Sequence, residues 1–372
     1  MRIGIITFHA SFNYGSMLQA WALQTYLRNC GYDVEIVNYR SKIQRETYHK
    51  PIDFCNKANA LSSLKRILLF PQSIFPLNKK WHLFDNFLHT ELSLSHVVHT
   101  LDELYKYRWN YDLLICGSDQ IWNTNAPDSG EAYYGNWFHG RKIAYAASFG
   151  QYPENVKWDF INSQLNNFGA IGLREEKGQK WLLEKNTQKM MNVEVVCDPT
   201  LLLDVSCYDK LIDEEPLIQD DYIFFYTPVD IPYDYFKIAK DLGKRFGCKV
   251  ITEKAYYPKD IKRFGIEEYL MVGPREFLNL VKNATYVVGG SFHLQVFSIL
   301  MHKNFFCING DKDARTNYLL KYVGLSNRII SVDNPTFVDS PQICNWCEVD
   351  AKLKTYCNYS KNWLNLKLKD EN

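Results

Sequence analysis

The sequence predicts an α/β protein of two Rossmann-like, doubly wound domains that face a cleft. Two observations predict this class. Short apolar runs that resemble buried strands alternate with helix-like stretches along most of the 372 residues, a pattern typical of parallel sheets covered by helices on both faces. A polar segment, DEEPLIQDD at 213–221, interrupts the alternation, and a chain of this length readily forms two domains.

The strand-like runs form two series, one on each side of that segment. The first is Arg2–Phe8, Asp33–Tyr39, Tyr111–Gly117, Lys142–Phe149, Ala170–Arg174 and Val193–Asp198; the second is Tyr222–Thr227, Lys249–Glu253, Tyr286–Val288, Phe305–Asn309 and Arg328–Ser331. We therefore expect an N-terminal domain at 1–212 and a C-terminal domain at 222–345. A helical tail at 346–372 is expected to pack back on the N-terminal domain.

Residues 41–110 fit the alternation less well. Within them, LKRILLFPQSIFPLNKKWHLF at 64–84 mixes basic residues with Leu, Ile, Phe and Trp. Two interpretations stay open. One is a partly helical insertion that covers the first sheet. The other is a membrane-surface patch, in which basic residues meet anionic lipid while aromatic side chains enter the interface.

Composition excludes several classes of partner. The net charge is +1, so a broad basic face for nucleic acid is not predicted. No apolar run reaches the roughly eighteen residues needed to span a bilayer, and no signal-peptide pattern precedes the first strand. Several of the ten cysteines lie in apolar runs. Near Cys344 and Cys347 lies only one more cysteine, Cys357, and no histidine follows, so a four-ligand zinc site is not predicted. We expect a cytoplasmic protein, peripheral at the inner face of the membrane if the patch binds lipid.

Three loops lie where ligands bind in doubly wound sheets, beyond the carboxyl ends of strands. They are TFHASFNYGS at 7–16, CGSDQIWN at 116–123 and GGSFH at 289–293. In the first, a helix start supplies unpaired N–H groups for an anion, or is simply a capped helix; it is neither a dinucleotide fingerprint nor a Walker loop. In the second, Asp119 either orients a hydroxyl or caps a helix.

The third loop carries a histidine, and two arginines lie near other strand ends. His293 follows Gly289 and Gly290, which we expect to clear space around it. A helix N-terminus disfavours a protonated ring unless an anion lies nearby, in which case the histidine becomes a candidate general acid. A structurally satisfied histidine is the alternative. Arg174 and Arg315 offer planar forks suited to carboxylate or phosphate, or form ordinary salt bridges.

Six blocks, in this order, resemble the polysaccharide pyruvyl transferase family. They are GIITFHASFNYGSMLQAWALQTYL, DLLICGSDQIWN, YAASFG, LREEKG, CDPTLLL and GGSFHLQVFSILMHKNFF. The resemblance extends from residue 3 to about 330. It implies a glycosyltransferase-B-like arrangement, with the acceptor on the side of the domain at 1–212 and phosphoenolpyruvate on the side of the domain at 222–345. It also implies transfer of pyruvate from phosphoenolpyruvate to sugar hydroxyls of a surface polysaccharide. The acceptor is often lipid-linked, and the product is typically a cyclic ketal.

The resemblance also assigns residues. The family's S-F-H histidine falls on His293, its S-x-R-E arginine on Arg174, and a second arginine on Arg315. The departures are Gly172 for the usual serine, Gly289 and Gly290 where Thr-Asp is common, and Leu294 for a glycine.

We therefore expect His293 to act as acid and Asp119 to orient or deprotonate the acceptor. The remaining candidates are Arg174, Arg315 and Ser291 for phosphoenolpyruvate, and Asn13, Tyr14, Gly15, Gln19, Ser118 and Gln120 for the acceptor. No metal or cofactor is expected, since phosphoenolpyruvate is the donor substrate. Two alternatives stay open: a glycosyltransferase that uses a nucleotide sugar, and a non-catalytic carbohydrate-binding protein.

Overall fold

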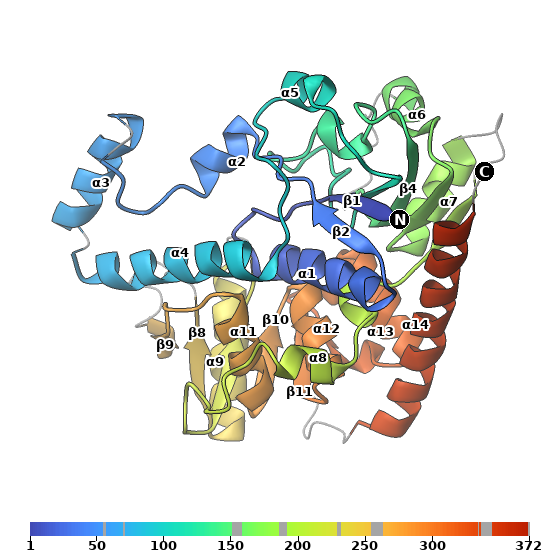
Figure 1. Cartoon of the computed structure of the whole chain (residues 1–372). Coiled ribbons are helices and arrows are strands. Elements are labelled where there is room, and N and C mark those ends of the chain that lie inside the picture. The colour runs from blue at the N-terminus through green and yellow to red at the C-terminus, as the bar shows by residue number, and fades with distance from the viewer. Residues whose placement is uncertain are drawn as a thin grey trace.

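The computed structural model has two parallel sheets, one in each half of the chain (Figure 1). It describes residues 1–54, 57–69, 71–150, 158–185, 192–228, 232–253, 263–333, 335 and 344–370. The strand order is β2-β1-β3-β4-β5-β6 in the first sheet and β12-β11-β10-β7-β8-β9 in the second. Every pairing between neighbouring strands is parallel. The predicted fold class is therefore confirmed.

All the predicted strands are present. The first sheet contains β1 (Arg2–Ile6), β2 (Asp33–Ile36), β3 (Leu113–Cys116), β4 (Arg141–Ala147), β5 (Ala170–Leu173) and β6 (Val193–Val195). The second contains β7 (Tyr222–Phe225), β8 (Lys249–Thr252), β9 (Ile266–Glu268), β10 (Tyr286–Gly289), β11 (Asn304–Ile308) and β12 (Ile329–Ile330). The strand β9 was not predicted; it is an edge strand in which only the isoleucine is buried.

Helices connect and cover the strands. Those of the first half are α1 (Tyr14–Asn29), α2 (Lys42–Thr47), α3 (Lys57–Leu69), α4 (Pro71–Glu91), α5 (Leu101–Lys106), α6 (Trp158–Leu165) and α7 (Glu176–Lys185). Then come α8 (Val205–Asp209), α9 (Tyr233–Phe246), α11 (Pro274–Asn283), α12 (Phe292–Leu300), α13 (Ala314–Val323) and α14 (Trp346–Lys369). Within the described residues, every helix is too short or too polar to span a bilayer.

Each sheet reverses its strand order once, and the two reversals decide where a ligand can bind. In the first sheet β1 has β2 on one side and β3 on the other; in the second, β7 has β8 on one side and β10 on the other. The crevice outside the carboxyl ends of strands at such a point is the usual ligand site. The loops after β1, β3, β7 and β10 are therefore the expected walls of a site.

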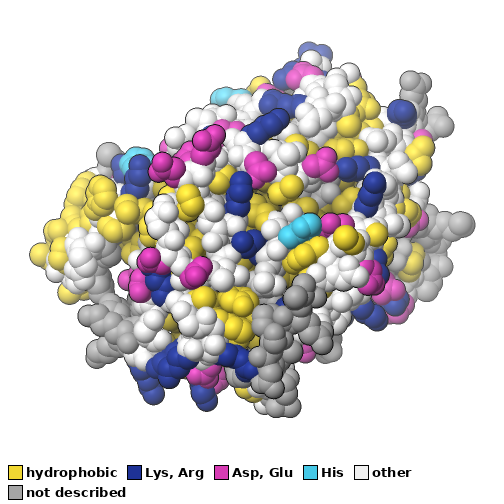
Figure 2. Space-filling model, turned by 90° about the horizontal axis from the view of Figure 1, so that it is seen from below, with side chains coloured by type: hydrophobic (Ala, Val, Ile, Leu, Met, Phe, Trp, Pro, Cys, Tyr) yellow, Lys and Arg dark blue, Asp and Glu magenta, His cyan; other side chains and the backbone are white. Residues whose placement is uncertain are grey.

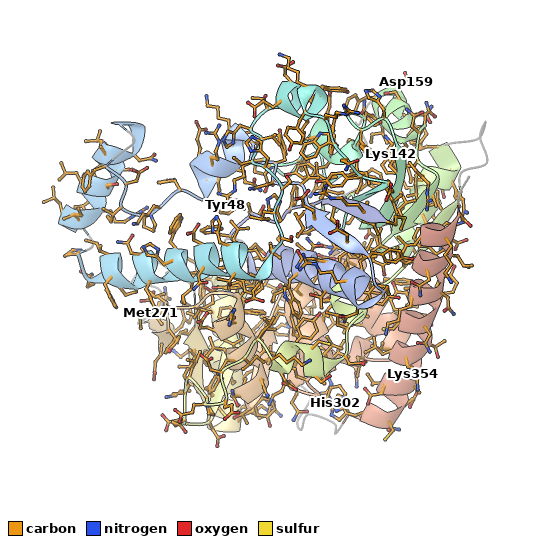
Figure 3. All side chains as sticks on the ribbon, viewed as in Figure 1. Tyr48, Lys142, Asp159, Met271, His302 and Lys354 are labelled. Atoms are coloured by element: carbon orange, nitrogen blue, oxygen red, sulfur yellow. The ribbon has the colours of Figure 1, made fainter. Side chains whose placement is uncertain are left out.

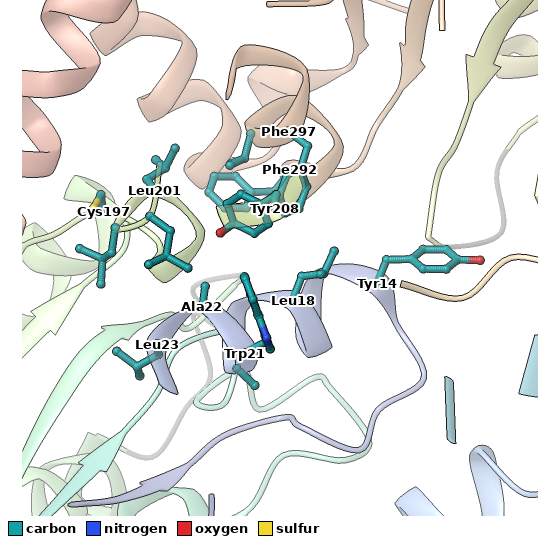
Figure 4. Close-up of a cluster of buried hydrophobic side chains, with 14 of the residues drawn as sticks. Tyr14, Leu18, Trp21, Ala22, Leu23, Cys197, Leu201, Tyr208, Phe292 and Phe297 are labelled. Carbon is teal, nitrogen blue, oxygen red and sulfur yellow. The ribbon is translucent and has the colours of Figure 1, made fainter. Parts of the chain in front are cut away.

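A continuous apolar core joins the two halves through α1. Its Leu18 and Trp21 face Phe297 of α12 across Tyr208 of α8 (Figure 4). The ring centroids of Trp21 and Tyr208 lie 5.4 Å apart, and those of Tyr208 and Phe297 lie 5.1 Å apart. Because α1 is covered by its own sheet and by the second domain, it is buried on nearly all sides. This packing fixes the loop that precedes α1 against the second domain.

The region 41–110 is helical, as expected, but α4 does not simply cover the first sheet. Its second half packs at the junction of the two domains, where Phe84, Phe87 and Leu88 are buried. Lys80 forms an ion pair with Glu253 of the second domain. The first half of α4 and all of α3 extend away from the body (Figure 1).

Helix α14 returns to the first domain. Ser360 Oγ accepts a hydrogen bond from the backbone N–H of Cys197 at 2.8 Å, and Tyr359 donates to Glu194 at 2.8 Å. The family departure at Gly172 has its explanation here. A Cβ on Gly172 would lie 3.1 Å from the Trp363 ring of α14 and 2.8 Å from Val196. The nine described cysteines are all free, and Cys55 lies outside the described residues.

Candidate active site

Both points of strand reversal open onto one pocket of about 320 Å³ between the domains. Its lining is mainly polar and comes from both halves of the chain: Phe8, Ser11, Asn13, Ser16, Tyr48, Asp119, Gln120, Ala126, Asp128, Pro228, Ser291, Phe292, His293 and Arg315. Larger cavities of about 600 and 710 Å³ open near α14. Neither lies at a strand reversal, so the smaller pocket is the candidate active site.

Capped helix starts position several of these side chains. The Asn13 side chain caps α1 by accepting from the Ser16 N–H at 3.3 Å, and Ser291 caps α12 by accepting from the Leu294 N–H at 3.4 Å. Asp313 caps α13 by accepting from the Arg315 N–H at 2.9 Å. The start of a helix carries partial positive charge, which favours bound anions.

His293 is held between the two domains. It is 7% exposed and lines the pocket. The backbone of Gly15 crosses its ring so closely that a Cβ there would lie 2.0 Å from Nδ1. On the other side, Nε2 lies 3.4 Å from Oδ2 of Asp198. Gly15 therefore contributes to the site by the space that it leaves for His293.

The expectation for the two glycines before His293 was wrong. A Cβ on Gly289 would lie 1.8 Å from the carbonyl oxygen of Tyr226, so this glycine lets β10 approach β7. A Cβ on Gly290 would face Ile308 O at 3.3 Å. Neither glycine clears space around the histidine. Leu294 is fully buried and is not part of the pocket lining, so this family departure belongs to the packing of α12.

A buried network of opposite charges lies behind the histidine. Arg174 Nη1 donates to Asp198 Oδ2 at 2.7 Å, and Nη2 lies 3.4 Å from Asp119 Oδ1. Asp198 Oδ1 also accepts from the backbone N–H and the hydroxyl of Thr200, at 3.0 and 2.6 Å. Burial raises the pKa of Asp198, but the charges of His293 and Arg174 outweigh burial and hold it far below its ordinary value. Asp198 is therefore a carboxylate.

Asp119 reaches the pocket from the end of β3. Its backbone adopts φ 74°, in the left-handed region, and its Oδ2 accepts from Ser16 Oγ at 2.5 Å. Burial raises the pKa of this carboxyl, but the charges of Arg174 and His293 and the serine hydrogen bond together lower it below its ordinary value. Asp119 is thus an ionised acceptor of hydrogen bonds on the pocket wall.

Arg315 is the guanidinium that faces the pocket. Its Nε donates to Asp313 Oδ1 at 3.0 Å, and a second contact joins Nη2 to the same carboxylate. When the amide oxygen of Gln120 faces the arginine, it accepts from Nη1 and Nη2 at 2.5 and 2.6 Å. Burial lowers the pKa of Arg315, but the Asp313 carboxylate more than offsets this and raises it above its ordinary value. Phe292 packs under the guanidinium, with 5.6 Å from Cζ to its ring centroid.

The structure thus brings most of the predicted site residues to one place, with four differences. Arg174 is 2% exposed and lies behind Asp119, outside the pocket lining. Tyr14 is directed away from the pocket and donates to Glu253 at 2.7 Å. Gln19 donates to Thr7 Oγ1 at 2.9 Å within the core. Ser118 is fully buried and donates to Ala146 O at 3.0 Å. These side chains support the site from behind.

Sequence reasoning missed five polar residues of the site. Asp198 stood at the end of a predicted strand and within the family block CDPTLLL, but neither signal was used to select it as a site residue. Ser11 and Ser16 lay in the first predicted ligand loop but were not among the predicted site residues. Asp128 and Tyr48 reach the pocket from irregular segments (Figure 3 labels Tyr48). Asp128 accepts from Ser11 Oγ at 2.9 Å, and burial raises the pKa of its carboxyl.

The fold is glycosyltransferase-B-like, with two Rossmann-like domains and a candidate ligand pocket between them. The chain belongs to the polysaccharide pyruvyl transferase family, because the sequence model of that family matches residues 13–312. Members of this family are transferases that act on polysaccharide. No curated protein sequence matches the chain with significance.

Solved structures resemble the chain at low sequence identity. A candidate UDP-N-acetylglucosamine 2-epimerase from Listeria monocytogenes is 9% identical, with a TM-score of 0.50, over 96% of this chain and 90% of that chain. UDP-GlcNAc 2-epimerase from Neisseria meningitidis is 11% identical, with a TM-score of 0.48, over 97% and 93%. E. coli heptosyltransferase WaaC is 12% identical, with a TM-score of 0.41, over 95% and 99%. At these identities the likeness concerns the fold alone.

Proposed function

We propose that the protein transfers the pyruvyl group of phosphoenolpyruvate to two hydroxyls of a sugar in a polysaccharide precursor and forms a cyclic ketal. The observation that carries the proposal is the convergence of His293, Asp119 and Arg315 on one pocket in a chain of this family. His293 supplies an acid, Asp119 a carboxylate that accepts the proton of a sugar hydroxyl, and Arg315 a guanidinium that binds an anion. No cofactor enters the proposed reaction.

The donor is an anion with a carboxylate and a phosphate, and two features of the pocket suit it. Arg315 offers a charged fork on the pocket wall. Ser291, Phe292 and His293 form the start of α12, where backbone N–H groups and the helix dipole favour an anion. Arg174 acts in this scheme as a positioning residue, because its guanidinium holds the carboxylates of Asp119 and Asp198.

In the first step, a protonated His293 gives a proton to the methylene carbon of phosphoenolpyruvate. The carbon becomes a methyl group, and C2 becomes electron-poor. A sugar hydroxyl attacks C2 and forms a C–O bond while its proton passes to Asp119. Because the Asp119 carboxylate is ionised and lies in the pocket, it can orient that hydroxyl from the start. The Asp198 carboxylate beside Nε2 complements the charge of the histidine.

In the second step, the bond between C2 and the phosphate oxygen breaks and inorganic phosphate departs. A second hydroxyl attacks C2 and closes the ketal ring. The two hydroxyls release two protons. One restores the proton that His293 gave to the methyl group, and the other leaves on phosphate. Arg315 and the start of α12 stabilise the departing anion, because their fixed charge and dipoles take the place of its solvation by water.

Phosphate release from phosphoenolpyruvate, measured with a panel of hexosides and lipid-linked sugars, tests the reaction. We expect release that depends on the acceptor and falls at least ~10²-fold in His293→Ala, since positioned acid–base groups contribute about 10²–10⁴-fold. His89→Ala is the matched control, because His89 is exposed on α4. Near-normal turnover of His293→Ala would refute the proposed role of this histidine.

A further inference from the structure

The hairpin formed by α3 and α4 exposes a concentrated group of large apolar side chains. Leu61, Leu64, Leu68, Leu69 and Phe75, here called the apolar patch, are between 48% and 71% exposed. Figure 2 shows hydrophobic side chains gathered at the end of the molecule where this hairpin extends in Figure 1. Phe54, just before α3, is also exposed, whereas the remaining exposed large apolar side chains in the described residues are scattered over the surface.

Helix α3 turns its apolar face outward. Leu61, Leu64 and Leu68 follow the i, i+3, i+7 spacing of one helix face, and all three are exposed. On the inner side, Ser63 is 1% exposed and accepts a hydrogen bond from the backbone N–H of Asp53 at 2.9 Å. A helix in water would adopt the opposite orientation. The exposed leucines therefore indicate that the hairpin meets an apolar partner.

The charge of the hairpin identifies the kind of partner. The hairpin, residues 57–91, contains five Lys and Arg residues and two acidic residues, Asp85 and Glu91, which lie in the half of α4 nearer the body, although the whole chain has 43 basic and 42 acidic residues. Among them, Lys65 and Lys79 are exposed, and Lys65 shares the outward face of α3 with Leu61 and Leu68. Apolar side chains interleaved with lysines fit a bilayer that contains anionic lipid. Two copies of the same basic patch would repel each other.

The hairpin is connected directly to the pocket. Trp81 of α4 donates from Nε1 to the carbonyl oxygen of Tyr48 at 3.0 Å, and Tyr48 lines the pocket. At 1.5 Å per residue, Phe75 lies only about 9 Å from Trp81 along the axis of α4. A surface that holds the patch would therefore lie close to the mouth of the pocket.

We propose that the apolar patch docks the protein on a membrane containing anionic lipid. The leucines and Phe75 enter the interface, and Lys65 and Lys79 contact the anionic headgroups. The further consequence, that a lipid-anchored acceptor is presented to the pocket, rests on the proposed function, whereas membrane docking does not.

Cosedimentation of the full chain with vesicles tests docking. The vesicles are phosphatidylcholine alone and phosphatidylcholine mixed with phosphatidylglycerol. We expect the unaltered protein to bind the mixed vesicles. Two double variants, Leu64→Gln/Leu68→Gln and Lys65→Gln/Lys79→Gln, should each reduce this binding about tenfold or more. The matched control is Leu183→Gln with Leu366→Gln, which removes leucines that are 48% and 61% exposed on other helices and is expected to bind as the unaltered protein does.

Three outcomes would overturn docking. The first is that the protein binds neither kind of vesicle, and the second is that the control pair loses as much vesicle binding as the patch variants do. The third is a dimer, seen in sedimentation velocity, that the Leu64 and Leu68 substitutions abolish, because such a dimer assigns the patch to a second copy of the chain. Phosphate release with a soluble glycoside separates the two proposals. Patch variants should release phosphate with the soluble glycoside at the rate of the unaltered protein. If neither the unaltered protein nor any variant releases phosphate, that result counts against the proposed function and does not affect the conclusion from the vesicles.

Discussion

Replacing Gly15 by alanine separates activity from stability more cleanly than any other single change in the site. Gly15 is the second residue of α1, a position where alanine is favoured over glycine by about 1 kcal/mol in intrinsic helix propensity. The new Cβ would lie 2.0 Å from His293 Nδ1, whereas ordinary contacts begin at 3.4 Å, so the ring must move by about 1.4 Å. A misplacement of about 1 Å can cost ~10²-fold in rate.

We therefore expect Gly15→Ala to lower kcat for acceptor-dependent phosphate release by about 10²-fold. Its melting temperature should fall by no more than a few degrees, because overpacking beside a buried ring typically costs about 1–3 kcal/mol and the gain in helix propensity offsets part of this cost. Gly169→Ala is the control, since a Cβ there meets only Lys142 O at 3.6 Å. A Gly15→Ala protein with turnover within about threefold of normal would refute the role given to His293 and to its placement by the α1 backbone.

Three further predictions concern the groups around the pocket. Asp198→Asn should destabilise the fold by about 3–5 kcal/mol in denaturant titrations, because it leaves the buried Arg174 without its closest carboxylate; a loss below 1 kcal/mol would contradict this. Although burial opposes ionisation of Asp313, the charge of Arg315 lowers the pKa of the Asp313 carboxyl from 3.8 to about 2. The ionised carboxylate therefore stabilises the fold by about 2 kcal/mol above pH 4, and this contribution is lost as the pH falls toward 2. Asp313→Asn should flatten that part of the stability curve, and an unchanged slope would count against the assignment. Tyr14→Phe should cost about 1–3 kcal/mol of stability through the lost hydrogen bond to the Glu253 carboxylate while leaving KM for the acceptor unchanged, whereas a large rise in KM would return Tyr14 to the sugar site.

The fold was accessible from the sequence because buried parallel strands are continuous apolar runs. Such runs are distinct from the amphipathic helices between them, and this contrast located strands such as β3 and β7 correctly. The exception, β9, shows the limit of the criterion: at a sheet edge a strand needs only one buried residue, so Ile266–Glu268 carries no apolar run. The course of α4 along the domain junction was also hidden, because it depends on contacts with the second domain.

The site was accessible only in part. Strand-end position pointed to Asp119 and His293, which both line the candidate pocket, since loops at the carboxyl ends of neighbouring strands meet. The roles of Asp198 and Gly15 could not be predicted, because each depends on a contact between segments far apart in the chain. Tyr14 shows the converse error: it lies beside pocket residues in the sequence, but the helix turns its side chain into the aromatic core, where it stacks on Phe277 at 4.6 Å.

Binding of phosphoenolpyruvate is the most direct test of the central claim, because it does not require the acceptor to be known. Thermal unfolding would be followed with increasing phosphoenolpyruvate, inorganic phosphate or UDP-GlcNAc, for the unaltered protein and for Arg315→Met. We predict a concentration-dependent rise in Tm with phosphoenolpyruvate that exceeds the effect of phosphate and is lost in Arg315→Met. Stabilisation by UDP-GlcNAc with no response to phosphoenolpyruvate would contradict the proposal and favour a nucleotide-sugar enzyme.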